Sequence, residues 1–169
     1  WHWATGQFWQ WVQKGLSFYP KGATGFVDVR DVALSAIALM ESDITGERYI
    51  VNGSNQPYYE LFAQIAKGLG KPAPRFLMRA WMGALAWRWE ALRARLMGTA
   101  PAITPDVVQM VQNSFTYSHE KLLRALPKFA FTPFEQTIAE TSAAFRQSQA
   151  EKKPFGLLPL ETAAGYSVL

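Results

Sequence analysis

The chain has 169 residues, 49 % of them hydrophobic and 18 % charged, a composition that excludes a disordered chain and allows one domain with its own core. It contains no cysteine and two histidines, which excludes disulfides and cysteine-based metal sites and disfavours a histidine metal cluster or a Ser-His-Asp triad. Its 17 basic and 13 acidic side chains leave a net charge of +4, and no apolar run approaches the roughly 20 residues of a membrane span. We therefore expect a cytoplasmic protein that does not bind nucleic acid, and these features disfavour a membrane as its partner.

The first third of the chain predicts a helix, a loop, and a strand that leads into a second helix. Residues 5–15 are aromatic-rich and have helical spacing. After a loop marked by proline and glycine, residues 25–29 form a short β-rich run. Asp31 is placed to cap a helix over residues 32–41, whose apolar side chains share one face.

The middle of the chain predicts one buried strand and two helices. Residues 48–51 have the composition of a buried strand, and Pro57 stands at the first position of the next helix. A long helix is expected over residues 77–97 and ends at Gly98. The helix that follows Pro57 is expected to face the core through Leu61, Phe62, Ile65 and Leu69.

The last third predicts three further helices. One starts at residues 104–106, and a short one spans residues 119–126. Residues 132–135 read TPFE, which has the form of a capping box and begins a final helix that runs to about residue 149.

The predicted strands are too few to form a sheet of their own. Two or three short strands among this many helices leave strand edges without partners, which is costly when the edges are buried. We therefore expect residues 1–150 to be one unit from the back end of a larger α/β protein. Residues 151–169 contain two prolines and two glycines and are expected to be an irregular tail.

Three segments carry motifs in a defined order. Residues 25–33 read GFVDVRDVA, and residues 46–53 read GERYIVNG and are followed by YYELFA at residues 58–63. Further on, Ser118-x-x-Lys121-Leu122 precedes the Phe-Thr-Pro sequence that ends at Pro133. This ordered set resembles the C-terminal half of the extended short-chain dehydrogenase/reductase family, the NAD(P)-dependent epimerase, dehydratase and dihydroflavonol-reductase-like proteins. Pro127 departs from the pattern, because the family usually has glycine there.

The resemblance implies an α/β fold, the C-terminal part of a Rossmann-like doubly wound fold with few short strands and a mainly helical substrate-binding subdomain. In the family, the glycine loop that binds NAD or NADP and the catalytic Tyr-x-x-x-Lys pair lie in the N-terminal half. Neither is present at the expected place, so no catalytic and no cofactor-binding residue is assigned. Tyr117 and Lys121 have the catalytic spacing, but they come too late in the order and overlap the terminal motif.

Departures from the family pattern bear on the substrate. Family members that act on nucleotide sugars usually have an arginine at the position of Thr24, and an Arg-Pro-Gly-Asp stretch that residues 107–117 lack. The loss of these phosphate donors disfavours a nucleotide sugar and favours a small, largely apolar carbonyl or alcohol. The candidate substrate-binding residues are Trp3, Phe8, Trp9, Thr24, Phe26 and Asp28.

Each candidate has a structural alternative. The aromatic residues of the first helix can equally form core packing, which is the commoner role of such a stripe. Asp28 can point into the site or pair with Arg30 or Arg48, and Asp31 is better explained as a helix cap than as a catalytic acid.

The resemblance implies that the parent protein transfers hydride between the nicotinamide and a substrate carbonyl, and that this chain alone is inactive. A non-catalytic relative that senses NAD(P) is the main alternative.

The helix over residues 77–97 allows a third interpretation. Its apolar side chains have helical spacing and its arginines lie largely elsewhere on the helix, which favours a core-packing helix with an arginine rim. A contact with a partner or a second copy, and a contact with a membrane surface, are the alternatives. The apolar side chains are Met78, Trp81, Leu85, Trp89, Leu92 and Leu96.

Overall fold

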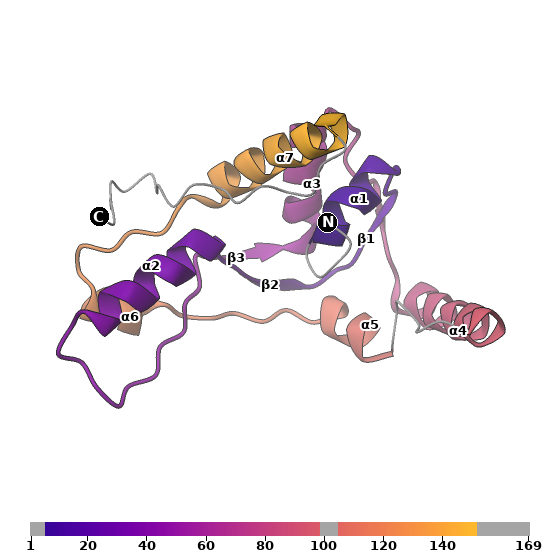
Figure 1. Ribbon diagram of the computed structural model, residues 1–169. Coiled ribbons are helices and arrows are strands. Elements are labelled where there is room, and N and C mark those ends of the chain that lie inside the picture. Colours follow the sequence, from indigo (N-terminus) through magenta and orange to yellow (C-terminus); the bar gives the residue numbers. More distant parts are fainter. Residues whose placement is uncertain (1–5, 99–104, 152–169) are drawn as a thin grey trace.

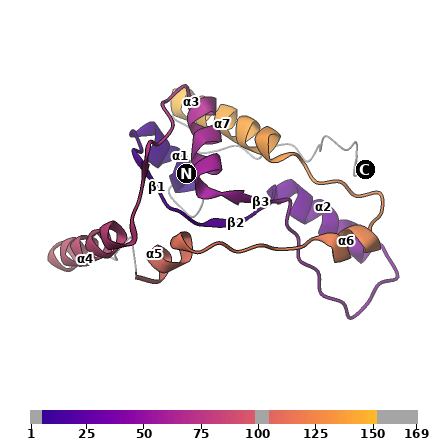
Figure 2. The same ribbon diagram turned by 180° about the vertical axis from the view of Figure 1, so that it is seen from behind.

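The computed structural model describes residues 6–98 and 105–151 and shows a mixed α/β protein (Figures 1 and 2). In chain order the elements are α1 (Gly6–Gln13), β1 (Phe18–Tyr19), β2 (Ala23–Phe26), α2 (Val29–Met40), β3 (Ser54–Pro57), α3 (Tyr58–Leu69), β4 (Phe76–Leu77), α4 (Ala80–Met97), α5 (Pro105–Gln112), α6 (Glu120–Ala125) and α7 (Phe134–Glu151). Helices α1, α3 and α7 lie on one side of the β2–β3 ribbon, and α5 with the segment after it lies on the other (Figures 1 and 2). Helices α2 and α6 form one end of the molecule, and α4 forms the opposite end.

Two short sheets connect these layers. In the antiparallel β2–β3 pair, Ala23 lies opposite Pro57 and Phe26 lies opposite Ser54. The parallel β1–β4 pair joins Phe18–Tyr19 to Phe76–Leu77. An isolated parallel bridge links Ala23 to Ser114, so the segment after α5 runs along the free side of β2.

The predicted strands are displaced from the observed ones. Strand β2 spans Ala23–Phe26 rather than residues 25–29, because the Asp28 carboxylate accepts a hydrogen bond from the backbone N–H of Arg30 and starts α2 at Val29. The expected cap, Asp31, is therefore inside the first turn of α2. Asp28 is the N-cap, which corrects the prediction.

The second predicted strand, over residues 48–51, is not a strand in the structure; β3 lies at Ser54–Pro57. Side chains from a distant segment bind a carbonyl group in this stretch and another just after it. Lys121 Nζ donates to the Arg48 carbonyl oxygen at 3.1 Å, and the His119 ring contacts the Asn52 carbonyl oxygen. Pro57, predicted at the first helical position, instead serves as the N-cap of α3.

The core forms around α3. Its predicted inward residues Leu61, Phe62, Ile65 and Leu69 are all buried, which confirms the periodicity argument. Helices α1 and α7 cover α3 and complete the core with Trp9, Val12, Phe134, Ile138 and Phe145.

The three helices meet at one position where their backbones come close together. A Cβ added to Gly68 of α3 would lie 2.6 Å from the Cβ of Ser142 on α7, so only glycine fits there. The hydroxyl of Ser142 accepts a hydrogen bond of 2.9 Å from the indole nitrogen of Trp9 on α1. This contact joins residues 133 positions apart in the sequence and closes the core.

Helix α4 begins at Ala80 rather than at residue 77, because Phe76 and Leu77 pair with β1. It ends at Gly98 as predicted. The prediction that its apolar side packs into a core is wrong for the described residues: Trp81 and Trp89 are 64 % and 71 % exposed.

The remaining helices lie near their predicted ranges. Helices α5, α6 and α7 begin at Pro105, Glu120 and Phe134, each within two residues of the sequence prediction. Trp3 and most of the predicted tail lie outside the described residues. No described helix is both long enough and apolar enough to cross a membrane.

Candidate functional site

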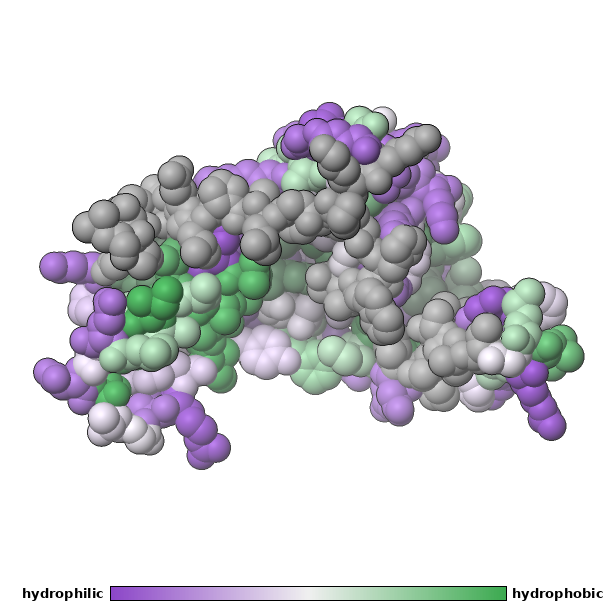
Figure 3. All heavy atoms as spheres, viewed as in Figure 1, coloured by the Kyte–Doolittle hydropathy of each residue, from purple (hydrophilic) through white to green (hydrophobic). Residues whose placement is uncertain are grey.

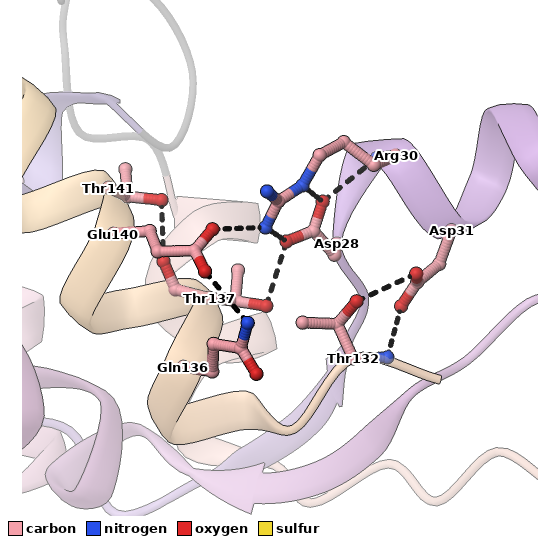
Figure 4. Close-up of polar contacts among 8 residues, drawn as sticks. All are labelled: Asp28, Arg30, Asp31, Thr132, Gln136, Thr137, Glu140 and Thr141. Carbon is pink, nitrogen blue, oxygen red and sulfur yellow. Dashed lines mark hydrogen bonds and ion pairs between the residues drawn. The ribbon is translucent and has the colours of Figure 1, made fainter. Parts of the chain in front are cut away.

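A buried polar cluster joins the start of α2 to α7 (Figure 4). The Asp28 carboxylate accepts hydrogen bonds from Arg30 Nε at 2.9 Å and Nη2 at 2.7 Å, and from the Thr137 hydroxyl at 2.8 Å. Arg30 also forms an ion pair of 2.6 Å with Glu140. The side chains of Asp28 and Arg30 are 2 % and 5 % exposed, so the ion pair between these two residues is shielded from water.

The surroundings of Asp28 and Arg30 shift the pKa values of both side chains. Burial acts to raise the pKa of Asp28, but the hydrogen bonds from Arg30 and Thr137 and the charge of Arg30 outweigh burial and hold the pKa below its usual value. The hydrogen bond to Asp28 raises the pKa of the Arg30 guanidinium, against the opposing effect of burial. Both groups are therefore ionised at neutral pH, as a structural ion pair requires.

Asp31 connects α2 to the chain that enters α7. Its carboxylate accepts a hydrogen bond of 2.7 Å from the backbone N–H of Thr132 and one of 2.9 Å from the Thr132 hydroxyl (Figure 4). Burial raises the pKa of Asp31, and these two hydrogen bonds only partly oppose that effect. Asp31 therefore joins two segments of the protein and lies buried rather than facing a reaction site.

The predicted substrate-binding residues fall into two groups. Asp28 is paired with Arg30, one of the alternatives that the sequence left open, and Trp9 has the contacts of a core residue. Phe8 and Phe26 are half-buried: Phe8 packs edge-on against Phe62, whereas Phe26 contacts Tyr58 and Phe134. Thr24 lies half-buried in β2, where it pairs with Gln56.

A second polar cluster, which the sequence analysis did not assign, lies beside β2. The amide nitrogens of Asn52 and Asn55 donate to the Tyr117 carbonyl oxygen at 3.1 and 2.9 Å, and Asn55 Oδ1 accepts from the Tyr117 N–H at 2.9 Å. His119 Nδ1 contacts the Asn52 carbonyl oxygen, and its ring stacks on Phe131 at 5.0 Å between centroids. The Asn-Gly pair after the apolar run at residues 48–51 is the signal that marks this turn in the sequence.

The chemistry of this cluster is hydrogen bonding rather than nucleophilic attack. Because a carbonyl oxygen can only accept, the contact of His119 Nδ1 with the Asn52 carbonyl requires a proton on Nδ1. The Ser54 hydroxyl is buried and has no hydrogen-bond partner among the described residues. These groups can orient a polar substituent of a ligand, and none is arranged as an activated nucleophile.

Tyr117 and Lys121 do not form a pair. Lys121 Nζ binds the Glu47 carboxylate at 2.5 Å and lies 5.0 Å from the centre of the Tyr49 ring. The hydrogen bond to Glu47 raises the pKa of Lys121. This lysine therefore links α6 to the loop before β3.

The described residues contain no group of three or more His, Asp or Glu side chains that could hold a metal ion. Comparison with solved structures shows a likeness in fold. The chain is similar to the crystal structure of gox2253, with a TM-score of 0.63 and 22 % sequence identity, over 84 % of this chain and 43 % of that one. This chain thus spans less than half of that structure, and at this identity the likeness concerns the fold alone. No protein-family model and no curated protein matches the chain.

Proposed function

We propose that this chain is the substrate-binding half of an NAD(P)-dependent oxidoreductase or epimerase-like enzyme of the cytoplasm. The substrate class is a small, largely apolar carbonyl or alcohol, and the reaction is hydride transfer to or from its carbonyl carbon. The fold likeness covers 84 % of this chain and 43 % of a longer one, which supports the part of the proposal that makes the chain a portion of a larger fold; it carries no information on activity.

The observation that carries the proposal is that the three motif segments contact one another. Asp31 of the first segment binds Thr132 of the third through two hydrogen bonds. Lys121 of the third binds the carboxylate of Glu47 and the backbone of the second. Motifs matched only by their order in the sequence are thus joined into one framework, as expected if they belong to a single fold.

The residues left to contact a substrate lie along β2 and the turn beside it. Thr24 and Phe26 are half-buried, and Tyr117 is 40 % exposed next to the asparagine cluster. These side chains combine apolar surface with a few hydrogen-bonding groups and carry no charged group themselves, which suits an uncharged carbonyl or alcohol. In this proposal Trp9 and Asp28 do not contact the substrate. Trp9 packs in the core, and Asp28 is paired with Arg30.

The described residues do not suit the dinucleotide cofactor. They include no glycine-rich turn between a strand and a helix of the kind that receives a pyrophosphate. We therefore assign the binding of NAD or NADP, and the tyrosine that acts as acid and base, to a part of the parent protein other than this chain.

The test titrates the 169-residue chain with NADPH and follows the heat of binding. We expect no saturable binding in the micromolar range, and saturable binding would contradict the proposal. The complete reading frame that contains this chain is then expressed and mixed with NADPH and a panel of apolar ketones and aldehydes. Oxidation of NADPH is the expected result, whereas NADPH binding without turnover of any substrate would favour the non-catalytic sensor.

A further inference from the structure

One face of α4 carries an exposed row of bulky apolar side chains, which we call the α4 stripe. Its members are Trp81, Leu85, Trp89, Leu92 and Leu96, all more than half exposed. In Figure 3, hydrophobic and hydrophilic surface lie side by side at the end of the molecule that α4 forms. Contiguous apolar surface of this kind marks an interaction site more often than a chance exposure.

The stripe faces away from the protein because α4 uses its small residues to pack. A Cβ added to Gly83 would lie 2.6 Å from Val108 Cγ1 of α5, and Ala94 is only 4 % exposed. At about 100° per residue, Gly83 and Ala94 lie on the side of the helix opposite the stripe. The described part of the chain therefore contacts the small-residue side and leaves the bulky side uncovered.

Arginines border the stripe on both sides. With the same rotation of about 100° per residue, Arg88 and Arg95 flank one side of the stripe and Arg93 flanks the other. Arg93 pairs with Glu90 at 2.5 Å. Within the described residues, Arg88 and Arg95 form no ion pair with a carboxylate; Arg88 instead lies 4.7 Å from the centre of the Trp87 ring.

The net positive charge of the chain lies in α4 and the five residues before it. Residues 75–97 contain five arginines and one glutamate, a net charge of +4, which equals the net charge of the whole chain. The other residues are therefore neutral in sum. Salt screens electrostatic interactions beyond a Debye length of about 10 Å. An anionic surface that approaches α4 is therefore attracted mainly by this local excess of positive charge.

We propose that the α4 stripe docks this protein onto an anionic phospholipid bilayer, with α4 lying in the plane of the surface. The tryptophans and leucines of the stripe enter the boundary between headgroups and acyl chains, and Arg88 and Arg95 bind lipid phosphates at that boundary. The position of α4 at one extremity of the molecule leaves the core and the β2–β3 ribbon outside the bilayer (Figures 1 and 2). This association is peripheral and needs no membrane-spanning helix.

A second copy of the chain fits the same surface less well. A symmetric dimer through the stripe brings identical surfaces together, so the bordering arginines of one copy meet those of the other. The single acidic residue of the helix, Glu90, is already paired with Arg93. Like charges at close range oppose such a dimer, whereas phosphate headgroups neutralise them.

The test measures sedimentation of the full chain with vesicles of phosphatidylcholine, with and without added phosphatidylserine. We expect the protein to sediment with the anionic vesicles only, to be released by high salt, and to show a blue shift of tryptophan emission on binding. The double variant Arg88→Gln/Arg95→Gln should lower vesicle affinity about 25-fold, at roughly fivefold per arginine.

Two further variants separate the stripe from general surface effects. Trp81→Ser/Trp89→Ser should abolish sedimentation, whereas Met40→Ser, which removes an equally exposed apolar side chain from α2, should leave it unchanged. Circular dichroism checks that each variant keeps its helix content. Absence of binding by the wild type, equal binding to neutral vesicles, or a dimer that the stripe variants dissociate would overturn the proposal.

Discussion

Arg30 is a buried cation whose charge is shared between two carboxylates from different helices. Asp28 holds the guanidinium through two hydrogen bonds, and Glu140, whose side chain is 35 % exposed, contacts it from α7. Such a group is stable in the interior only while its partners remain ionised and in place. The join between α2 and α7 therefore depends on Asp28 more than on any apolar contact at that position.

Replacing Asp28 with asparagine should destabilise the protein by about 3–5 kcal/mol near neutral pH, because the buried Arg30 loses its main counter-charge. The folded-state pKa of Asp28 is lowered, so its contribution is present above the unfolded pKa, near 3.8, and is lost as pH falls through the folded pKa. The difference between wild type and Asp28→Asn should therefore shrink below about pH 4. Urea unfolding at a series of pH values measures both effects.

The matched control is Asp43→Asn, which changes an exposed carboxylate in the loop after α2. It should alter stability by no more than about 0.5 kcal/mol. A cost for Asp28→Asn as small as that of the control, or one that grows on acidification, would contradict the structural ion pair.

At the scale of single residues, an aspartate was correctly predicted to cap α2, but the prediction named Asp31 whereas the N-cap is Asp28. Asp28 and Asp31 both precede helical residues, and local pattern favours each of them as a cap. The Asp31 carboxylate instead accepts hydrogen bonds from Thr132, which lies 101 residues away in the sequence. No local signal contains that partner, although the alternative of an Asp28–Arg30 pair was visible from their spacing.

The packing of α3 against α7 depends on the absence of a side chain at Gly68. An alanine at this position places its Cβ against Ser142, whose hydroxyl is also engaged by Trp9. The variant Gly68→Ala should cost about 1–3 kcal/mol, because overpacking outweighs the helix propensity that alanine gains. Thermal or urea unfolding measures the loss.

Lys67→Ala is the control for helix propensity, since Lys67 is the exposed neighbour on the same helix. It should change stability by no more than about 0.5 kcal/mol. A stabilised Gly68→Ala variant would show that the two helices can separate without loss.

Helices were predictable from the sequence where buried apolar residues recur at the spacing of a helix. Helix α3 was predicted almost to the residue, because its buried side recurs every three or four positions and Gly70 follows it. The run at residues 48–51 was predicted as a strand on composition alone. Lys121 binds the Arg48 carbonyl oxygen and His119 contacts the carbonyl of Asn52 just after the run, and no pattern within the run contains these distant partners.

At the scale of the whole molecule, the last turn of α5 and the segment after it attach the α4–α5 end to the β2–β3 ribbon. The Gly22 N–H donates to the Val111 carbonyl oxygen at 3.0 Å, and the Phe115 N–H donates to the Ala23 carbonyl oxygen at 2.9 Å. A Cβ at Gly22 would collide with the carbonyl oxygens of Val111 and Asn113. The close approach of these backbones joins the two halves of the described structure.

The variant Gly22→Ala should therefore loosen this attachment while leaving the helical core intact. Amide hydrogen exchange is expected to rise at Ala23 and Phe115, and to remain slow at Ile65 in the centre of α3. The neighbouring exposed variant Lys21→Ala should change neither. A uniform rise over the whole chain would show that the ribbon and the core unfold as one unit.

The overall architecture was predictable only in class. Few short strands among many helices indicated a mixed α/β protein, and the structure confirms that coarse description. The direction in which α4 faces was not predictable, because its apolar and small-residue sides both look like core positions in a helical pattern. Contact with α5 through Gly83 selects the small-residue side.

The contact between Trp9 and Ser142 has a consequence for the order of assembly on the ribosome. Helix α1 leaves the exit tunnel before α3 and can meet it early, but the surface of α3 that α7 covers stays open until almost the whole described chain has been made. Because contacts between such distant residues require a long loop to close, they slow folding. During that interval the nascent chain exposes the surface of α3 around Gly68 that α7 later covers, so a chaperone that shields apolar segments should raise the yield of folded protein more than one that acts after release.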